Sequence, residues 1–402
     1  MTEAKKYYDV IVIGAGPAGG QCARELAKAG RKVILLEHAP EIGQPNYSTA
    51  GTPQETVEEF ELPVKVLSAT WNRIFFASTH RTAEWVYPDT RGYVFDFAAL
   101  KKFLAEDAAR HGADTMVGAA ATEFIKDGNK IVGLKYKGIL GEGELRAKYI
   151  VDATGHWGFA NSHLHINEVR QQDLASGLEV QMVGMPAGFA KTLAFFVGEV
   201  APGGYAWLFP MEDSQAVKIG IGTIGGKLPP GTDLKKLLKN FIGRLSGASQ
   251  LKPTEIHGGG GYISKGVKNQ VYANIILIGD AACQVNALAY EGIRHALYGG
   301  RLAALQINQA LIEDWSLANL KNQYESAWRR HFSWRWRASY NFADMAYRQF
   351  NDADWDNLVK GLNTLSPSAA FQLFFKYRYE LMLLHPRLVF GFGKKILQNL
   401  RG

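Results

Sequence analysis

The first forty residues combine apolar runs, a glycine cluster and a helix-like segment. Residues 7–13 form a short apolar run, which is typical of a parallel strand buried on both faces. A helix-like segment over residues 21–28 ends at Gly30, and a second apolar run follows at residues 32–36. This order predicts a βαβ unit.

Two later apolar runs also lead into turns of small residues. Residues 149–152 run into a turn at 153–155, and residues 274–278 run into a glycine-led turn and a helix-like stretch over 293–311. Each pattern alone is a common junction between a strand and a turn. In the second, Asp280 stands beside a helix N-terminus, where a carboxylate can bind a ribityl hydroxyl or position a pyrophosphate.

Between these turns, glycine and proline divide the chain into short runs of high β-propensity. Such runs predict an antiparallel sheet. They cover residues 178–182, 193–197, 206–209 and 216–221. We therefore expect three domains: a discontinuous nucleotide-binding domain, an antiparallel-sheet domain for the substrate, and a C-terminal helical cap. Their expected bounds are 1–160 with 265–311, 161–264, and 312–402.

The glycine cluster after the first run fits the pattern G-x-G-x-x-G. Gly14 permits a tight turn, Gly16 lets the backbone approach a pyrophosphate, and Gly19 lets helix and strand pack closely. Glu37 follows the second apolar run, where a carboxylate can accept hydrogen bonds from an adenosine ribose. The motif predicts dinucleotide binding. Ala18 lies in the same segment and is also expected to bind the cofactor.

The same glycine pattern occurs again at residues 220–225. No helical segment follows it, because residues 227–231 read KLPPG. A phosphate-binding motif needs the N-terminus of the following helix. The second match therefore predicts only a strand end and a turn.

Composition indicates a folded protein. The chain has 402 residues, of which 47% are apolar and 21% are charged, so we expect roughly two or three domains and exclude a disordered chain. The two cysteines, Cys22 and Cys283, support neither a disulfide framework nor a metal cluster, and the ten histidines show no ligand spacing. We expect no metal and a reducing compartment.

Targeting signals are missing from the pattern as well. The N-terminus does not read as a signal peptide, and no uncharged apolar run reaches the roughly 18 residues of a membrane-spanning helix. The sequence predicts a protein that is cytoplasmic, either free or peripheral at a membrane.

The nucleotide motif and the two turns, in this order, resemble the FAD-dependent oxidoreductases of the glutathione-reductase and hydroxybenzoate-hydroxylase type. This resemblance implies a Rossmann-like FAD-binding domain with FAD as cofactor. It implies that the two turns and the start of the last helix bind FAD through Ala153, Thr154, Gly155, Gly279, Asp280, Gly292 and Ile293. Because no second nucleotide-binding βαβ unit is visible, electrons would come from a visiting NAD(P)H or from another protein.

The segment YAWLFP at residues 205–210 narrows the prediction. Strand alternation places Tyr205, Trp207 and Phe209 on one face, which reads either as a plain hydrophobic face or as an aromatic wall. The segment resembles the Y-x-W-x-F-P motif of the geranylgeranyl reductase family, where that wall lines an apolar tunnel to the flavin. Residues 279–293 and 257–263 are similar to two further segments of that family.

Several positions depart from the family pattern. The family has glycine, proline and glycine where this chain has Cys283, Ala287 and Tyr290. Ser48 is the best match to a cysteine that archaeal relatives place near the reacting double bond, and Phe97 stands where an arginine commonly contacts FAD. These departures weaken the match at the flavin face.

The resemblance predicts an enzyme that reduces carbon–carbon double bonds of an isoprenoid, geranylgeranyl-type chain. Such a reduction needs a hydride from flavin N5 and a proton on the neighbouring carbon. The candidate catalytic residues are Ser48, Tyr205, Trp207 and Tyr290, with Cys283 as another possible proton donor. Two alternatives stay open: a flavin-dependent monooxygenase or cyclase acting on a hydrophobic substrate, and a lipid-binding protein without turnover.

The positive charge is concentrated at the C-terminal end. The formal net charge of the whole chain is +7, and residues 329–402 hold twelve Lys and Arg against five Asp and Glu. Five of the nine tryptophans also lie beyond residue 312, and residues 371–384 show helical spacing of aromatic residues. This pattern fits a helical cap, or a cap that also contacts a membrane surface. A nucleic-acid partner is not expected, because no known binding module is present.

Overall fold

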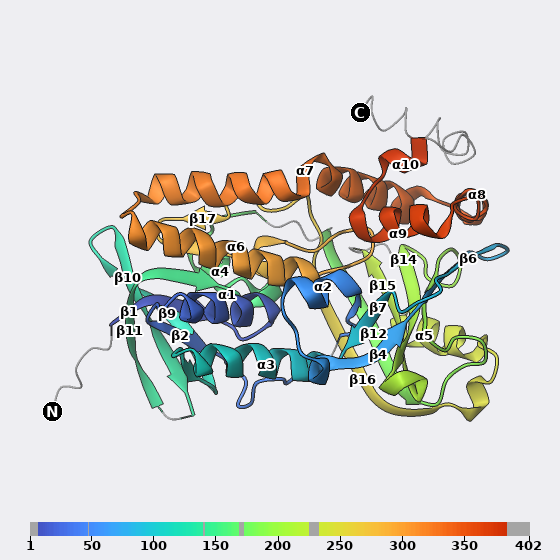
Figure 1. Cartoon of the computed structure of the whole chain (residues 1–402), viewed down its shortest axis with the longest axis horizontal. Coiled ribbons are helices and arrows are strands. Elements are labelled where there is room, and N and C mark those ends of the chain that lie inside the picture. Colours follow the sequence, from blue (N-terminus) through green and yellow to red (C-terminus); the bar gives the residue numbers. More distant parts are fainter. Residues whose placement is uncertain (1–6, 47, 140, 169–172, 225–232, 384–402) are drawn as a thin grey trace. The chain divides into compact units, whose positions relative to one another are not determined.

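The computed structural model describes residues 7–46, 48–139, 141–168, 173–224 and 233–383 (Figure 1). The chain divides into two compact units. The first unit contains residues 1–46, 97–170 and 261–333. The second contains residues 47–96, 171–260 and 334–402. The three domain ranges expected from the sequence stay a prediction.

An eight-stranded sheet forms the centre of the first unit. Its strand order is β17-β18-β11-β1-β2-β8, and β10 and β9 extend it by antiparallel pairing from β11. The pairs of β1 with β11 and β2, of β11 with β18 and of β2 with β8 are parallel. The strands are β1 (Tyr7–Ile13), β2 (Val33–Leu36), β8 (Asp114–Met116), β9 (Ala119–Asp127), β10 (Lys130–Gly138), β11 (Gly141–Asp152), β17 (Val271–Tyr272) and β18 (Ile275–Leu277).

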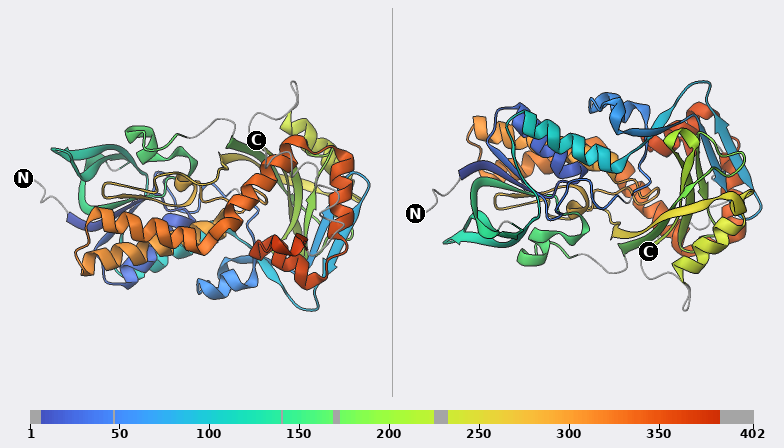
Figure 2. Two further views of the ribbon diagram at one scale, coloured as in Figure 1. Left: turned by 90° about the horizontal axis from the view of Figure 1, so that it is seen from above. Right: turned by 90° about the horizontal axis from the view of Figure 1, so that it is seen from below.

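Three helices pack beside this sheet. Helix α1 (Pro17–Lys28) contacts both α3 (Phe97–Arg110) and α6 (Ile293–Ile312). α1 begins four residues before the helix-like segment expected from the sequence, because the fixed backbone of Pro17 suits the first helical position. A short helix, α4 (Phe159–Leu164), follows β11. α6 and the first part of α7 (Leu317–Gln349) lie side by side (Figure 1, Figure 2).

The second unit contains two sheets. The larger one has the order β16-β12-β15-β14-β13-β5-β6, and the smaller has the order β3-β7-β4. The pairs from β12 to β13 are antiparallel, as expected from the sequence, whereas β13 and β5 are parallel. The larger sheet has β5 (Arg73–Ala77), β6 (Thr82–Val86), β12 (Leu174–Val183), β13 (Thr192–Phe196), β14 (Gly204–Met211), β15 (Ala216–Ile224) and β16 (Lys252–Tyr262). The smaller has β3 (Gly51–Pro53), β4 (Leu67–Trp71) and β7 (Gly92–Phe95).

One face of the larger sheet forms an apolar core with helix α5 (Leu234–Gly243). Ala206 and Leu208 of β14 and Ile219 of β15 pack in one cluster with Leu238 and Phe241 of α5. Tyr205, Trp207 and Phe209 alternate with these residues and therefore belong to the opposite face. The two faces of this sheet thus differ in chemistry.

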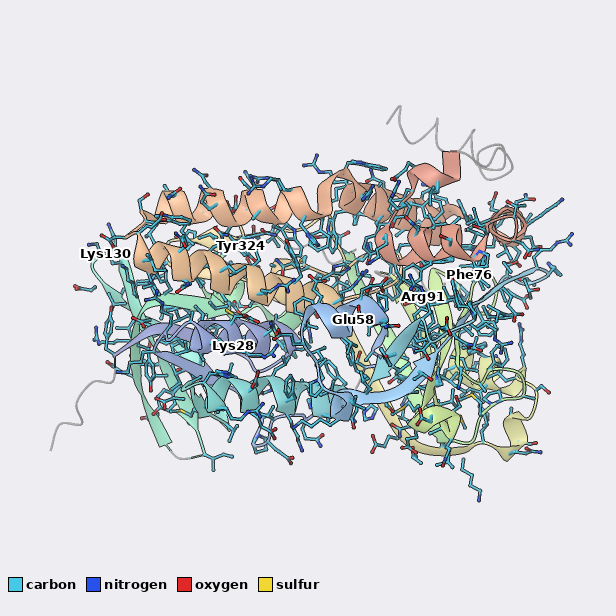
Figure 3. All side chains as sticks on the ribbon, viewed as in Figure 1. Lys28, Glu58, Phe76, Arg91, Lys130 and Tyr324 are labelled. Atoms are coloured by element: carbon cyan, nitrogen blue, oxygen red, sulfur yellow. The ribbon has the colours of Figure 1, made fainter. Side chains whose placement is uncertain are left out.

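The described part of the C-terminal region, up to residue 383, is helical, which confirms the sequence prediction; residues 384–402 lie outside the described residues. Its helices after α7 are α8 (Asp352–Leu362), α9 (Pro367–Lys376) and α10 (Glu380–Leu383), and α2 (Gln54–Glu59) lies earlier in the same unit. Phe374 of α9 stacks on Phe76 with ring centroids 6.0 Å apart, and Arg91 lies 3.7 Å from the ring centroid of Phe371. Figure 3 labels Phe76 and Arg91 among the side chains. The aromatic residues of α9 are therefore packing residues of the second unit.

Candidate functional site

The glycine motif forms a tight turn between β1 and α1. Gly14 has a φ of +100°, and a Cβ there would lie 2.4 Å from the carbonyl oxygen of Ala153. A Cβ on Gly19 would lie 1.9 Å from the carbonyl oxygen of Gly14. A Cβ on Gly16, in contrast, would meet no atom within 4 Å. Side chains are thus excluded where the turn packs, and space is open where a phosphate would approach.

Ala18 and the glycines of the later segments pack closely together. A Cβ on Gly279 would lie 2.9 Å from the Cβ of Ala18, and a Cβ on Gly300 would lie 2.2 Å from the Ala18 carbonyl oxygen. The contacts of Ala18 are therefore packing contacts that bring α1, α6 and the 279–282 turn together.

Glu37 lies at the end of β2, with most of its side chain buried. One carboxylate oxygen accepts a hydrogen bond from the backbone N–H of Ala15 at 2.8 Å. The other accepts one from the N–H of Ala39 at 2.8 Å and lies 2.8 Å from Nδ1 of His38. A carboxylate offers about four acceptor positions, so Glu37 keeps capacity for a further donor such as a ribose hydroxyl.

Asp152 organises the turn that contains Ala153, Thr154 and Gly155. Its carboxylate accepts hydrogen bonds from the Thr154 backbone N–H at 3.0 Å, the Thr154 hydroxyl at 2.6 Å and the Ala160 N–H at 2.6 Å. Burial raises the pKa of Asp152, although these hydrogen bonds favour the ionised form. Sequence reasoning included the turn but did not single out this carboxylate, which reads as the last residue of a buried strand.

The 279–282 turn carries Asp280 and is held by Gln284. The side-chain oxygen of Gln284 accepts a hydrogen bond from the Gly279 N–H at 2.7 Å, and its amide nitrogen donates to the Tyr324 hydroxyl at 3.1 Å. The Asp280 carboxylate makes no hydrogen bond within the described part of the chain. Burial raises its pKa, and the nearby His156 opposes that shift. Asp280 is thus an acceptor that lacks a donor.

Two of the departures from the family pattern fall on unusual backbone. Cys283 and Tyr290 have φ values of 52° and 49°, in the left-handed region that favours glycine. Glycine in the family pattern suits this conformation, whereas this chain holds side chains in it. Gly292 and Ile293 form the N-terminus of α6, and Gly292 provides no side-chain cap.

A partly buried ion pair stabilises the start of α6. Arg294 donates two hydrogen bonds to Glu291, at 2.7 and 2.9 Å, and His295 Nε2 lies 3.7 Å from the same carboxylate. Burial opposes ionisation of Glu291, but the two neighbouring groups hold the pKa of its carboxyl well below its usual range.

The predicted aromatic wall exists on β14 of the second unit. Phe195 of β13 lies between two of its members, with ring centroids 5.8 Å from Tyr205 and 5.2 Å from Phe209. The rings of Tyr205 and Trp207 are 5.6 Å apart. Tyr205 and Phe209 are buried and Trp207 is half-buried, so the three form one continuous apolar surface.

Trp207 crosses the neighbouring strand β15 at Gly220. A Cβ on Gly220 would lie 2.1 Å from Cζ2 of the indole, so no other residue leaves room for the ring. The indole N–H reaches β12, where it donates to Glu179 at 3.3 Å. Residues 220–224 of the second glycine motif therefore lie within strand β15, where Gly220 makes space for an aromatic ring. Gly225 and the predicted turn over residues 227–231 lie outside the described residues.

A buried ion pair lies beside this ring. Lys218 of β15 has a side chain that is 1% exposed, and its Nζ lies 3.6 Å from a carboxylate oxygen of Glu179, whose side chain is 8% exposed. The second carboxylate oxygen accepts a hydrogen bond from the Thr49 hydroxyl. Sequence reasoning missed this pair, because each residue occupies an ordinary position in a β-propensity run.

Ser48 belongs to the same network through its backbone. Lys218 Nζ donates a hydrogen bond of 2.6 Å to the Ser48 carbonyl oxygen. The structure thus groups Ser48, Trp207 and Tyr205 in the second unit, whereas Tyr290 belongs to the first. Their roles in catalysis stay predictions.

No group of three or more His, Cys, Asp or Glu side chains within the described ranges is placed to hold a metal ion. Among the helices that the structure describes, none combines the length and the apolar character needed to cross a bilayer.

Three features of the first unit fit FAD. The open space at Gly16 admits a pyrophosphate, Glu37 has acceptor capacity for a ribose, and the Asp280 carboxylate has no donor among the described residues. Together with the βαβ unit, they fit the class of FAD-dependent oxidoreductases, and the match of residues 9–158 to the FAD dependent oxidoreductase family confirms the predicted cofactor.

Comparisons with known proteins agree and go further. Residues 9–158 match the family model of FAD dependent oxidoreductases, and residues 173–262 match the geranylgeranyl reductase catalytic domain. The chain is 31% identical to digeranylgeranylglycerophospholipid reductase of Picrophilus torridus, over 88% of this chain and 90% of that protein. It is 30% identical to digeranylgeranylglycerophospholipid reductase 1 of Methanopyrus kandleri, over 84% of this chain and 90% of that protein. The chain belongs to the geranylgeranyl reductase family.

Solved structures share the fold. A geranylgeranyl bacteriochlorophyll reductase-like protein from Thermoplasma acidophilum aligns with a TM-score of 0.88 at 24% identity, over 97% of this chain and all of that one. A flavin-dependent brominase aligns with a TM-score of 0.66 at 17% identity, over 93% of this chain and all of that one. The predicted fold class, an FAD-binding α/β domain with an antiparallel-sheet domain and a helical C-terminal region, is confirmed.

Proposed function

We propose that this protein reduces carbon–carbon double bonds in the geranylgeranyl-type chains of a lipid. The observation that carries the proposal is the aromatic face of β14, which is continuous, apolar and distinct from the core face of the same sheet. The names of the archaeal relatives, digeranylgeranylglycerophospholipid reductases, support an isoprenoid lipid as the substrate class.

The cofactor would be held by the residues of the first unit that the sequence singled out. Gly16 would leave the backbone accessible to the pyrophosphate, while Gly14 and Gly19 keep the turn compact. Glu37 would accept a hydrogen bond from the ribose, and Asp280 would accept one from a ribityl hydroxyl. The turn at 153–155 and the α6 N-terminus complete the set. When bound and reduced, FAD supplies the hydride for the reduction.

The second unit would bind the isoprenoid chain. Tyr205 and Trp207 offer flat apolar surface, and the hydrogen bond from the indole to Glu179 fixes the orientation of the ring. The Ser48 hydroxyl makes no hydrogen bond to any described residue, while Lys218 anchors its backbone. We propose that the Ser48 hydroxyl relays a proton from water to the substrate.

Reduction can be tested directly under anaerobic conditions. The purified holoprotein is reduced with dithionite, freed of excess reductant and mixed with digeranylgeranylglycerophospholipid. We expect reoxidation of the flavin spectrum and a lipid that gains hydrogen by mass spectrometry. A flavin that reoxidises only with oxygen, giving a hydroxylated product, would replace this proposal with a monooxygenase. Protein that binds the lipid without any turnover would leave a carrier.

The aromatic face can be tested with a matched pair of variants. Trp207→Leu removes ring area and the hydrogen bond to Glu179, so we expect kcat/KM for the lipid to fall about ten- to a hundredfold. Val86→Ala changes an exposed residue of β6 in the same unit and serves as the control. Equal kcat/KM values for the two variants would remove Trp207 from the site.

The electron donor is the second open partner. NAD(P)H acting without a domain of its own and a small redox protein are the two candidates. Anaerobic mixing of the oxidised holoprotein with NADH, NADPH or a reduced ferredoxin separates them, because only the competent donor bleaches the flavin spectrum at a useful rate.

We also propose that the protein contacts a membrane surface through α7. Trp334 is 52% exposed, and Arg330 and Arg337 of the same helix are exposed as well. Tryptophan favours the bilayer interface, and arginine favours anionic headgroups. Arg330→Gln with Arg337→Gln should weaken binding to anionic liposomes. Arg335→Gln is the control, because Arg335 already pairs with Glu380 at 2.8 Å. Unchanged binding of the double variant would argue against membrane contact.

A further inference from the structure

A short segment after β2, residues 41–46, is held against helix α3 at three places. Lys102 pairs with Glu41 at 2.5 Å. Gly43 has a φ of +107°, and a Cβ there would lie 2.8 Å from the Cε of Lys102. Lys101 Nζ donates a hydrogen bond of 2.9 Å to the carbonyl oxygen of Pro45. The segment, called here the 41–46 loop, is thus fixed by α3.

Lys101 differs from Lys102 because it is buried. The residue is 7% exposed, and its Nζ lies 4.6 Å from the ring centroid of Phe97, one turn earlier on α3. An ammonium group has three N–H donors, but within the described ranges Lys101 uses one of them, on Pro45. The same residues place no carboxylate within ion-pair distance of it.

Glu37, the acid that attracts Lys101, already has other partners. Glu37 contributes an attraction to Lys101, but its carboxylate already accepts from the backbone N–H groups of Ala15 and Ala39 and lies against His38. Removing an ammonium group from water is costly unless a counter-charge or hydrogen-bond acceptors replace the water. A buried cation with donors to spare, beside a nucleotide site, is therefore suited to an anion that arrives with the ligand.

We propose that Lys101 is a cofactor-binding residue that contacts the anionic pyrophosphate of FAD. The pyrophosphate is the negatively charged part of oxidised FAD, so it is the part that recruits a cation. Phe97 shields the ammonium from water, and the Pro45 carbonyl orients it. This inference concerns FAD alone and does not depend on the proposed lipid substrate.

The electrostatics around Lys101 predict that FAD affinity depends on pH. Desolvation lowers the pKa of Lys101 to about 8, while Glu37 acts in the opposite direction. The carboxylate that acts on Lys101 is that of Glu37, and the next residue of α3, Lys102, pairs with Glu41. A bound anion raises the pKa of a neighbouring ammonium. Binding of FAD above pH 8 should therefore take up a proton, and the affinity should be full below pH 8 and fall as the pH rises above it.

The test measures FAD affinity of the apoprotein by titration calorimetry and quenching of flavin fluorescence. Lys101→Met keeps the length of the side chain and removes the charge, so we expect FAD affinity at pH 7 to fall about tenfold or more. Lys102→Met is the matched control, since the side chain of Lys102 is 44% exposed and pairs with Glu41; it should bind FAD as the original protein does. Lys101→Arg should keep FAD affinity at pH 9.5, where the original protein has lost part of it.

Two outcomes would overturn the proposal. One is equal FAD affinity of Lys101→Met and the original protein at pH 7. The other is the same fall in affinity above pH 8 in the original protein and in Lys101→Arg. If Lys101→Met does not fold, the arginine variant and calorimetry in buffers of different ionisation enthalpy still decide, because they detect proton uptake at pH 9 in the original protein.

A competition experiment separates the pyrophosphate from the rest of the adenosine half. ADP and adenosine compete for the nucleotide site, and they differ in the phosphates. Lys101→Met should lower the affinity for ADP and leave the affinity for adenosine unchanged. An equal loss for both ligands would show that Lys101 only holds the 41–46 loop, and would overturn the proposed contact.

Discussion

The buried pair of Lys218 and Glu179 makes a quantitative prediction for the second unit. The substitution Lys218→Met removes the positive charge and retains most of the apolar stem. Glu179 then keeps its negative charge in a site where its side chain is 8% exposed. Within the described ranges, the oxygen that faces Lys218 accepts no hydrogen bond, so no described protein group replaces the lost partner.

The magnitude follows from the separation of the two charges. At 3.6 Å, an effective dielectric constant of about 20 gives an attraction of about 4 to 5 kcal/mol. Breaking a buried pair by removing one partner typically costs about 3–5 kcal/mol. Lys218 also loses its hydrogen bond to the Ser48 carbonyl. We therefore expect Lys218→Met to lower the free energy of unfolding by about 3–5 kcal/mol.

A double-mutant cycle in urea, followed by tryptophan fluorescence, measures this value. Glu179→Gln together with Lys218→Met leaves two neutral groups, and the amide oxygen of the glutamine still accepts from Trp207. The double variant should recover more than half of the loss, which gives a large coupling energy. A loss below about 1 kcal/mol for Lys218→Met, or losses that simply add, would refute the reasoning, because the pair would then resemble an exposed salt bridge.

Two further predictions concern single positions. Gly220→Ala forces the indole of Trp207 to move, so it should lower the free energy of unfolding by about 1–3 kcal/mol and shift the tryptophan emission. Gly177→Ala is the control, because a Cβ there meets atoms no closer than 3.5 Å. An equal loss of stability in both variants would contradict the packing argument. Asp280 has a raised pKa in the folded protein, so its stabilising contribution exists below its unfolded pKa and is lost as the pH rises through the folded value. Asp280→Asn should therefore raise the Tm of the apoprotein at pH 7 and weaken FAD binding about tenfold; a lower Tm, or unchanged FAD affinity, would count against this account.

Much of the fold could be predicted from the sequence because its signals are local. The apolar run at 7–13 coincides with β1. The predicted helix over residues 293–311 begins at the same residue as α6. The start of α1 at Pro17 was missed, because proline and glycine read as a turn although proline suits the first helical position. The local pattern of residues thus predicts that a helix or strand exists more accurately than it predicts where that element begins and ends.

The buried charges could not be predicted, because they depend on contacts between distant residues. Glu179 and Lys218 lie on neighbouring strands, and Lys101 reaches a carbonyl 56 positions earlier in the chain. A lysine in a β-propensity run or on a helix reads as a solvated residue. Only the pairing of strands and the packing of α3 show that these ammonium groups are removed from water.

Trp207 and Gly220 have a consequence for redesign of the protein. The indole of Trp207 on β14 occupies the volume that a side chain at position 220 on β15 would fill. The side chains at positions 207 and 220 therefore have to fit into the same volume. Neither can be enlarged alone, but the pair can be exchanged. Placing the large residue at 220 and a small one at 207 would transfer the ring from β14 to β15 while keeping the total volume, and would thereby move the aromatic surface sideways by one strand.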